Sequence, residues 1–139
     1  MDYFPDLFAV LVAGLVPMVV GAIWYGPLFG QKWMDLSNKT EEQIRAEMNP
    51  LRQYGLTFVA GLLAAFVLAH GLQAFADAYG MDGWAYGMQG AFWVWLGYVV
   101  WVTWQEVAFD DKHVVLWLIN VTYNLAALLG MGAILGVWR

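Results

Sequence analysis

Four long apolar stretches constrain the fold of this chain more than any other feature. They lie near residues 7–29, 54–75, 85–107 and 114–137. Each is long enough to cross the hydrocarbon core of a bilayer, which takes about 20 helical residues. Inside lipid, only helices and closed barrels satisfy every backbone polar group. The stretches show no period-2 alternation and Pro17 interrupts the first, so the sequence predicts four transmembrane helices rather than strands.

The composition supports a membrane protein. Hydrophobic residues make up 62% of the 139 residues and charged residues 12%, against about 45–50% and 25% in a soluble domain. A soluble chain this short could not bury so much apolar surface. The net charge of −5 gives no basic surface for nucleic acid. We therefore expect one all-α domain over residues 1–139, a four-helix transmembrane bundle that contacts membrane lipids and no nucleic acid.

The segment 30–53 is the only long polar connection. Within it, Thr40-Glu41-Glu42-Gln43 has the spacing of a capping box, in which the first and last side chains satisfy each other's backbone amides. Glu41 can also pair with Arg45 one turn later. The sequence predicts a short amphipathic helix over about 40–49, which either lies on the membrane surface or serves as a solvated connector.

Lysine and arginine are distributed unevenly among the connections. The segment 30–53 carries four of them and the third connection, 108–113, carries Lys112, whereas the second connection, 76–84, has none. Since cytoplasmic loops are enriched in basic residues, the first and third connections are expected in the cytoplasm. The sequence therefore predicts a multi-pass protein of the cytoplasmic (inner) membrane with both termini outside.

Several segments of the chain resemble a known family. They are Trp24-Tyr25-Gly26-Pro27-Leu28-Phe29-Gly30 with Lys32-Trp33-Met34, then Leu118-Ile119-Asn120 with Tyr123, and the C-terminal Gly132-Ala133-Ile134-Leu135-Gly136-Val137-Trp138. The chain resembles the domain-of-unknown-function family DUF1761, which consists of small four-span prokaryotic membrane proteins. The resemblance implies a fold and a location. It assigns no activity, and no catalytic residue can be taken from it.

The helix-end motif consists of Trp24, Tyr25, Gly26, Pro27 and Gly30. Proline has no amide donor and disfavours helical angles in the residue before it, so the first span should end or bend here. The aromatic residues suit the headgroup layer of a bilayer. Two interpretations stay open: a shaped helix terminus, or a cytoplasmic gate hinged at the two glycines.

The middle of the first and fourth stretches holds the best candidate site. Pro17 deprives the Ala13 carbonyl of its helical donor, and Asn120 and Asn124 share one face of the fourth stretch. Inward-facing amides beside a broken helix could line a small polar pathway. Alternatively, Asn124 could donate to the free Ala13 carbonyl and act only in packing.

His70 is the only ionisable side chain that the predicted spans place clearly inside the hydrocarbon. It could titrate in a proton-linked function, or stay neutral and bond to a neighbour. The sequence has no cysteine, and it shows no pattern of paired buried carboxylates, nucleophile and base, or clustered metal ligands. We therefore expect no catalytic residue, no metal and no cofactor.

The sequence favours a non-enzymatic membrane protein that binds or passes a small solute. Four thin helices enclose little space, so a pathway would need a second copy of the chain. The Gly132-x-x-x-Gly136 pattern permits close helix contact within the bundle or across a dimer. The alternative is a structural or accessory subunit of a larger membrane complex, with another membrane protein as its partner.

Overall fold

The computed structural model describes residues 3–138, and these form helices and turns without a β-strand. Two π-helical segments, labelled η, interrupt or end the α-helices. The elements in chain order are α1 (Leu7–Ile23), η1 (Trp24–Leu28), α2 (Gly30–Ser37), α3 (Glu41–Glu47), α4 (Pro50–Tyr79), α5 (Trp84–Val94), η2 (Trp95–Val99), α6 (Val100–Phe109) and α7 (Val114–Val137). The predicted all-α class is confirmed.

Three helices are long and apolar enough to cross a membrane: Leu7–Leu28, Pro50–Tyr79 and Val114–Val137. The expected third span, 85–107, is helical throughout as α5, η2 and α6, but it is not among these three. Its sequence is rich in tryptophan, tyrosine, glycine and glutamine, which are less apolar than the leucine, valine and isoleucine of the other spans. The membrane-protein class is thus supported by length and composition, whereas the fourth span is not confirmed.

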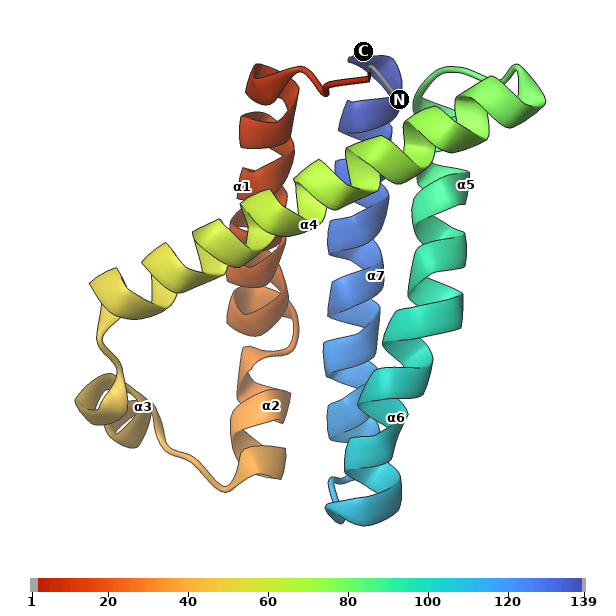
Figure 1. The fold of residues 1–139 in the computed structure, drawn as a ribbon. Helices are drawn as coiled ribbons and strands as arrows, with labels where there is room; N and C mark the ends of the chain where they lie inside the picture. The colour runs from red at the N-terminus through yellow and green to blue at the C-terminus, as the bar shows by residue number, and fades with distance from the viewer. Residues whose placement is uncertain (1–2, 139) are drawn as a thin grey trace.

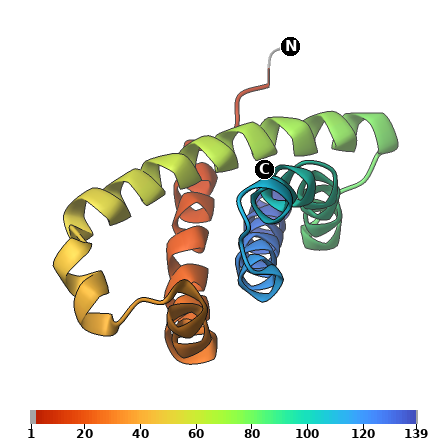
Figure 2. The same cartoon turned by 90° about the horizontal axis from the view of Figure 1, so that it is seen from below.

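The helices form a layer of three upright elements covered by one oblique helix. Helices α1 and α7 and the α5–α6 segment stand next to one another, and α4 crosses them diagonally (Figure 1). Seen from below, α4 lies entirely on one face of this layer (Figure 2). A helix of 30 residues is about 45 Å long and exceeds a hydrocarbon core of about 30 Å, so α4 must tilt to stay in it. A regular bundle of four near-parallel helices is not confirmed.

Helices α1 and α4 touch where Gly14 meets Gly61. A Cβ atom on Gly61 would lie 2.6 Å from the Gly14 carbonyl oxygen, and one on Gly14 would lie 3.2 Å from the Leu62 backbone nitrogen. Larger residues would hold the two backbones apart. Ala13 and Ala65, beside the crossing, are completely buried. Because α4 runs obliquely, it diverges from α1 and α7 away from this point and leaves a wedge beneath its first half.

Helices α5 and α7 pack backbone to backbone along a seam that we call the glycine seam. A Cβ atom on Gly87 would overlap the Gly132 carbonyl oxygen, and one on Gly136 would lie 3.0 Å from the Gly87 Cα atom. Ala91 continues the seam and is fully buried. The Gly132-x-x-x-Gly136 pattern therefore serves contact within the chain.

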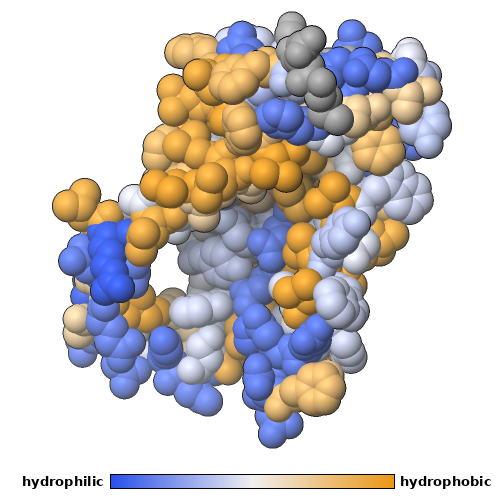
Figure 3. Space-filling view, in the orientation of Figure 1, coloured by the Kyte–Doolittle hydropathy of each residue, from blue (hydrophilic) through white to orange (hydrophobic). Residues whose placement is uncertain are grey.

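The outer surface is strongly apolar. Val67 and Leu63 on α4 are 68% and 64% exposed, and aliphatic or aromatic side chains on α1, α5, α6 and α7 are also exposed. The space-filling view shows apolar surface over α1 and much of α4 (Figure 3). A soluble monomer rarely exposes apolar patches of this extent, so lipid is the environment that suits this surface.

The polar connection holds two short helices. The capping box before α3 is confirmed: the Gln43 amide donates to Thr40 Oγ1 over 3.2 Å, and the Thr40 amide donates to Gln43 Oε1 over 2.9 Å. Arg45 pairs with Glu41 over 2.6 Å, as expected. Helix α2 was not expected. It extends the first span beyond its bend and ends at Asn38, which has a left-handed backbone conformation.

The basic connections lie at the same end of the molecule. The α2–α3 segment and the α6–α7 turn are at the bottom of Figure 1, and the α4–α5 turn is at the top, at the same end as the start of α1 and the end of α7. Lys112 pairs with Glu106 across the α6–α7 turn, and α6 and α7 run antiparallel on either side of it (Figure 1). This arrangement brings the helix-end motif to the basic end.

Candidate functional site

The helix-end motif changes the helix type and the chain direction together. Pro27 lies inside η1, where the Phe29 amide donates to the Trp24 carbonyl over 2.8 Å, five residues back. At Gly30 a Cβ atom would overlap the Tyr25 carbonyl oxygen, so the chain can turn into α2 only with glycine there. The sequence predicted a break at this proline, and the structure resolves it as a widened turn followed by α2.

Two aromatic residues of the motif fasten this turn to α7. The Trp24 indole donates to the Ile119 carbonyl oxygen over 3.0 Å, and the Tyr25 hydroxyl donates to Asn120 Oδ1 over 2.6 Å. The Tyr25 ring also lies edge-on to Tyr123, with centroids 5.2 Å apart. Segments that lie about 95 residues apart in the sequence thus meet at one place. The side chains of Trp24 and Tyr25 therefore hold the end of the first span against α7.

Helices α1 and α7 meet at the proline of α1, through a tyrosine. The Tyr123 hydroxyl donates to the Pro17 carbonyl oxygen over 2.9 Å. The bond expected from Asn124 to the Ala13 carbonyl is absent among the described residues. Consecutive helical residues point about 100° apart, so Tyr123 faces α1 while Asn124 turns toward α4 and η2. The longer tyrosine side chain also reaches further along α1.

The wedge beneath α4 contains three adjoining pockets, which together we call the groove. An outer pocket of about 880 Å³ lies between η1, α2, α3 and α7. A middle pocket of about 450 Å³ shares Tyr25 and Gly26 with the outer one. An inner pocket of about 330 Å³ shares Pro17, Thr57 and Tyr123 with the middle one. The groove therefore leads from the polar connection to Asn124.

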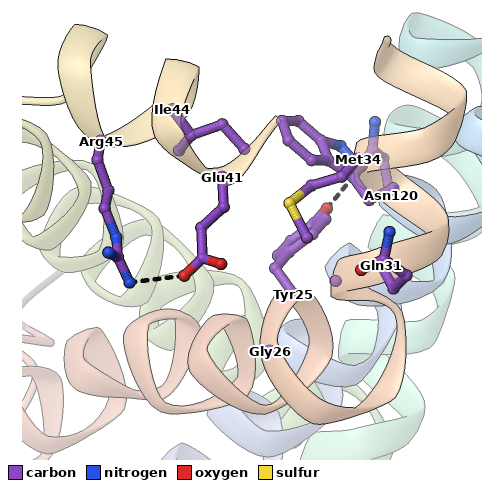
Figure 4. A pocket seen from close by; sticks show the side chains of 10 residues that line it. Tyr25, Gly26, Gln31, Met34, Glu41, Ile44, Arg45 and Asn120 are labelled. Atoms are coloured by element: carbon purple, nitrogen blue, oxygen red, sulfur yellow. Dashed lines mark hydrogen bonds and ion pairs between the residues drawn. The ribbon is translucent and has the colours of Figure 1, made fainter. Parts of the chain in front are cut away.

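The outer pocket is the wide mouth of the groove. Figure 3 shows the opening between the part of the chain that contains α3 and the rest of the molecule. In the close view, the Tyr25 hydroxyl points toward Asn120, and the Glu41–Arg45 pair lies on α3 away from them (Figure 4). These are the only charged side chains that line any of the three described pockets, and they neutralise each other.

Two asparagine amides give the groove its hydrogen-bonding capacity. Asn120 accepts from Tyr25 through Oδ1, so its NH₂ group keeps its donors. The Asn124 side chain has no hydrogen-bond partner within residues 3–138 and lines the inner pocket. No fully buried side-chain nitrogen or oxygen of the described residues is left unsatisfied, so the Asn124 amide is open to the groove. It can donate to or accept from a neutral polar group.

His70 lies outside the groove. Its Nδ1 atom is 2.8 Å from the Phe66 carbonyl oxygen, and its ring contacts Phe66 and Tyr3 with centroids 4.6 and 5.5 Å away. This geometry corresponds to the alternative in which the ring bonds to a neighbour. Of the residues proposed from the sequence, the structure gathers Pro17, Asn120 and Asn124 with Tyr25 and Gly26, and it separates His70 from them.

Sequence reasoning missed the contribution of α4. Tyr54 and Thr57, near the start of that helix, line the middle pocket. Their hydroxyl groups in an otherwise apolar stretch were the available signal, but only the oblique course of α4 brings them to the groove. Among the described residues, no group of three or more histidine, aspartate or glutamate side chains could hold a metal ion.

The comparison with known families agrees with the resemblance seen in the sequence. The pattern of the family described as "Protein of unknown function (DUF1761)" matches residues 8–136. No curated protein and no solved structure gives a significant match. The match spans the helix-end motif, its contacts on α7 and all the helices that enclose the groove, and the chain therefore belongs to the DUF1761 family.

Proposed function

We propose that this chain is a non-enzymatic membrane protein that binds a small uncharged solute in the groove. The observation that carries the proposal is the open, unpartnered amide of Asn124 at the inner end of three adjoining pockets. An unpaired amide in an apolar setting costs several kcal/mol by water-to-alkane transfer, about 4–8 in the extreme case. A ligand or water that bonds to Asn124 removes this cost.

The lining of the groove selects the chemical class of the solute. The middle pocket is walled by the aromatic residues Tyr25, Tyr54 and Tyr123 together with Pro17 and Met18. An ion would lose its hydration there without gaining an opposite charge. A compact molecule with one apolar face and one amide, carbonyl or hydroxyl group matches these walls and the Asn124 amide.

Binding is better supported than passage through a single copy. The inner pocket ends at Ala127, Leu128 and Met131. Met131 is only 1% exposed, and Leu135, one turn further along α7, is only 3% exposed. A route across the whole membrane would need a second protomer.

The test uses a cysteine in the middle of the groove, which is practical because the native chain has none. Thr57→Cys places a thiol where the middle and inner pockets meet and leaves Asn124 intact. We expect benzamide to slow alkylation of this thiol by iodoacetamide, and benzoate, which has the same shape with a charge, to have no effect. Adding Asn124→Leu should weaken protection about three- to tenfold, the worth of one net hydrogen bond.

Two results would reject solute binding at this site. One is equal protection by benzamide and benzoate, which would indicate an effect on the reagent or the detergent. The other is unchanged protection by benzamide after Asn124→Leu.

The proposal includes four spans in the cytoplasmic membrane with both termini outside. Its support is that the α2–α3 segment, which carries Lys32, Lys39 and Arg45, and the α6–α7 turn, which carries Lys112, lie at one end of the fold (Figure 1). Single cysteines at Asn38 and Asp82 test it with a membrane-impermeant thiol reagent. Only Asp82→Cys should react in intact cells. Labelling of Asn38→Cys alone would reverse the orientation.

A second candidate function, as a subunit of a larger membrane complex, is favoured by the α5–α6 segment. Its outer side chains Trp93, Tyr98, Trp101 and Trp104 are 55%, 70%, 64% and 44% exposed. Because this segment is the least apolar of the four expected spans, a protein neighbour would suit it better than lipid. Purification in mild detergent separates the two outcomes: a defined homo-oligomer supports self-association, and a stoichiometric second protein supports the subunit role.

A further inference from the structure

A separate pocket lies at the opposite end of the molecule from the groove mouth, where α4 turns into α5. It has a volume of about 240 Å³ and is lined by Phe75, Tyr79, Met81, Tyr86, Gln89, Gly90 and Trp93. This is the upper right corner of Figure 1. The pocket shares no lining residue with the groove, so the inference below is independent of the function proposed there.

Aromatic rings from two helices form most of the wall of this pocket. Phe75 and Tyr79 lie one turn apart on α4 with their rings stacked at an interplanar angle of 17°. Tyr86 and Trp93 face the same pocket from α5. Isolated aromatic residues at a membrane interface anchor a helix in the headgroup layer. Four aromatic residues from two helices line this one pocket, so a single ligand in it can contact several rings.

Two features fix the shape of the pocket. The Tyr86 hydroxyl donates to the Leu72 carbonyl oxygen over 2.9 Å, and this side chain is only 6% exposed, so its ring is held in place between α4 and α5. A Cβ atom on Gly90 would overlap the Leu72 side chain. Glycine at this position lets α4 and α5 approach while adding no side chain to the pocket itself.

The charged residues closest to the pocket in the sequence are both acidic. No lysine or arginine occurs between Arg52 and Lys112, and Asp77 and Asp82 are the only charged residues from 54 to 105. Asp82 lies in the turn beside Met81, and its carboxylate accepts from the Gly83 amide over 2.7 Å. Asp77 accepts from Gln73 over 2.8 Å. A cation in the pocket would meet no competing positive side chain from either wall.

We propose that this pocket binds a quaternary ammonium group. Aromatic faces attract such cations through the ring quadrupole, and cages of several rings are the usual protein site for methylated ammonium groups. A trimethylammonium group also places apolar methyl groups against the rings and Met81, and a pocket of about 240 Å³ accommodates it. The group could belong to a free solute or to the headgroup of a choline lipid, and both present the same chemistry to the pocket.

The first test measures binding of choline to the purified full chain in an uncharged maltoside detergent by equilibrium dialysis. The matched control ligand is 3,3-dimethylbutan-1-ol, which has the shape of choline without its charge. We expect saturable binding of choline that is about tenfold tighter than that of the neutral analogue, as cation–π contacts of this type predict.

Variants locate the binding. Trp93→Leu and Tyr79→Leu should each weaken choline binding about three- to tenfold, and Trp93→Phe should retain more affinity than Trp93→Leu because it keeps an aromatic face. Both positions are more than half exposed, so these changes leave the core intact. The control is Trp101→Leu. Trp101 is an exposed tryptophan of the same α5–α6 segment that does not line the pocket, so this change should leave choline binding unchanged.

Nanodiscs distinguish the two sources of the ligand. Choline binding is measured in nanodiscs of phosphatidylcholine and of phosphatidylglycerol. A lower apparent affinity in phosphatidylcholine means that the lipid headgroup occupies the pocket. Equal affinities in the two lipids assign the pocket to a free solute. The proposal is overturned by the absence of saturable choline binding in detergent, by equal binding of the neutral analogue, or by an equal loss in Trp101→Leu and Trp93→Leu.

Discussion

The glycine seam and the groove both lie along helix α7. They differ in the size and polarity of the side chains between α7 and its neighbours, which set how closely two helices approach. The seam uses the second half of α7, where Gly132 and Gly136 meet the backbone of Gly87 without intervening side chains. The groove uses the first half, where Asn120, Tyr123 and Asn124 face α1 and α4. Small residues close one end of the structure, and polar side chains beside a proline keep the other end open.

The comparison shows that close backbone packing and inward-facing polar side chains can occupy different halves of one helix. In lipid, helices associate through close packing and hydrogen bonds rather than through burial of apolar surface from water. Close backbone packing joins α5 and α7 along the seam, whereas three hydrogen bonds join α1 and η1 to α7 around the groove. Substitutions in the two regions should therefore have effects of different size and kind.

The largest effect on stability is expected when the glycines of α7 in the seam are replaced by leucine. Gly132→Leu combined with Gly136→Leu drives two side chains into the backbone of α5, where no flexible group can move aside. Overpacking in a core costs about 1–3 kcal/mol or more per site, so the double variant should lose several kcal/mol or fail to fold. Thermal unfolding in detergent, followed by circular dichroism, measures this loss.

Gly71→Leu is the control for this comparison. Nothing lies within 4 Å of a Cβ atom built at Gly71, so the same change in size should be tolerated there. If the seam variant unfolds at the same temperature as Gly71→Leu, the α5–α7 contact does not stabilise the fold.

An intermediate effect on stability is expected from the hydrogen bonds that join α7 to α1 and η1 beside the groove. Tyr123→Phe removes the donor to the Pro17 carbonyl, and Tyr25→Phe removes the donor to Asn120. Hydrogen bonds between membrane helices contribute about 0.6 kcal/mol on average and about 1.7 at most. Each variant should therefore lower the free energy of unfolding by an amount in this range. A loss as large as that of the seam variant would mean that the groove, too, is a main source of stability.

The smallest effect on stability is expected at Asn124. The Asn124 amide has no protein partner within the described residues, and water in the groove satisfies it. Asn124→Leu therefore removes no bond between helices and should change the free energy of unfolding by less than about 0.5 kcal/mol, as substitutions without a named mechanism do. Chemical denaturation in mixed micelles is suitable for so small a difference. A loss above about 1 kcal/mol would indicate that the amide is a packing device after all.

The sequence predicted the elements of this fold better than their arrangement. Apolar length located three spans, and the last began and ended at the predicted residues, 114 and 137. The capping box at Thr40 was also predicted correctly because capping depends on neighbouring residues alone. The oblique course of α4 could not be predicted, since the angle depends on contacts between distant segments, such as the one between Gly61 and Gly14.

Part of the candidate site could also be predicted, because some of its signals are local in the sequence. Proline in α1 and two amides on one face of α7 are local signals, and they identified Pro17, Asn120 and Asn124. The partner of each group depends on side-chain reach and rotation between helices, so the bond from Tyr123 to Pro17 replaced the expected bond from Asn124 to Ala13. Thr57 belongs to the site only because α4 crosses the upright helices.

The accessibility of position 124 tests the central difference between the two regions most directly. An Asn124→Cys thiol in a hydrated groove should react with iodoacetamide much faster than Leu63→Cys, which is on the exposed outer face of α4 and would face lipid, where a thiol stays protonated. Gly26→Trp should slow the reaction at position 124. Gly26 lines both the outer and the middle pocket, and nothing lies within 4 Å of a Cβ atom built on it, so a tryptophan there can fill the groove. Gly71→Trp is the control and should leave the rate unchanged. If Asn124→Cys reacts no faster than Leu63→Cys, or if Gly26→Trp leaves its rate unchanged, the groove does not lead from the polar connection to Asn124.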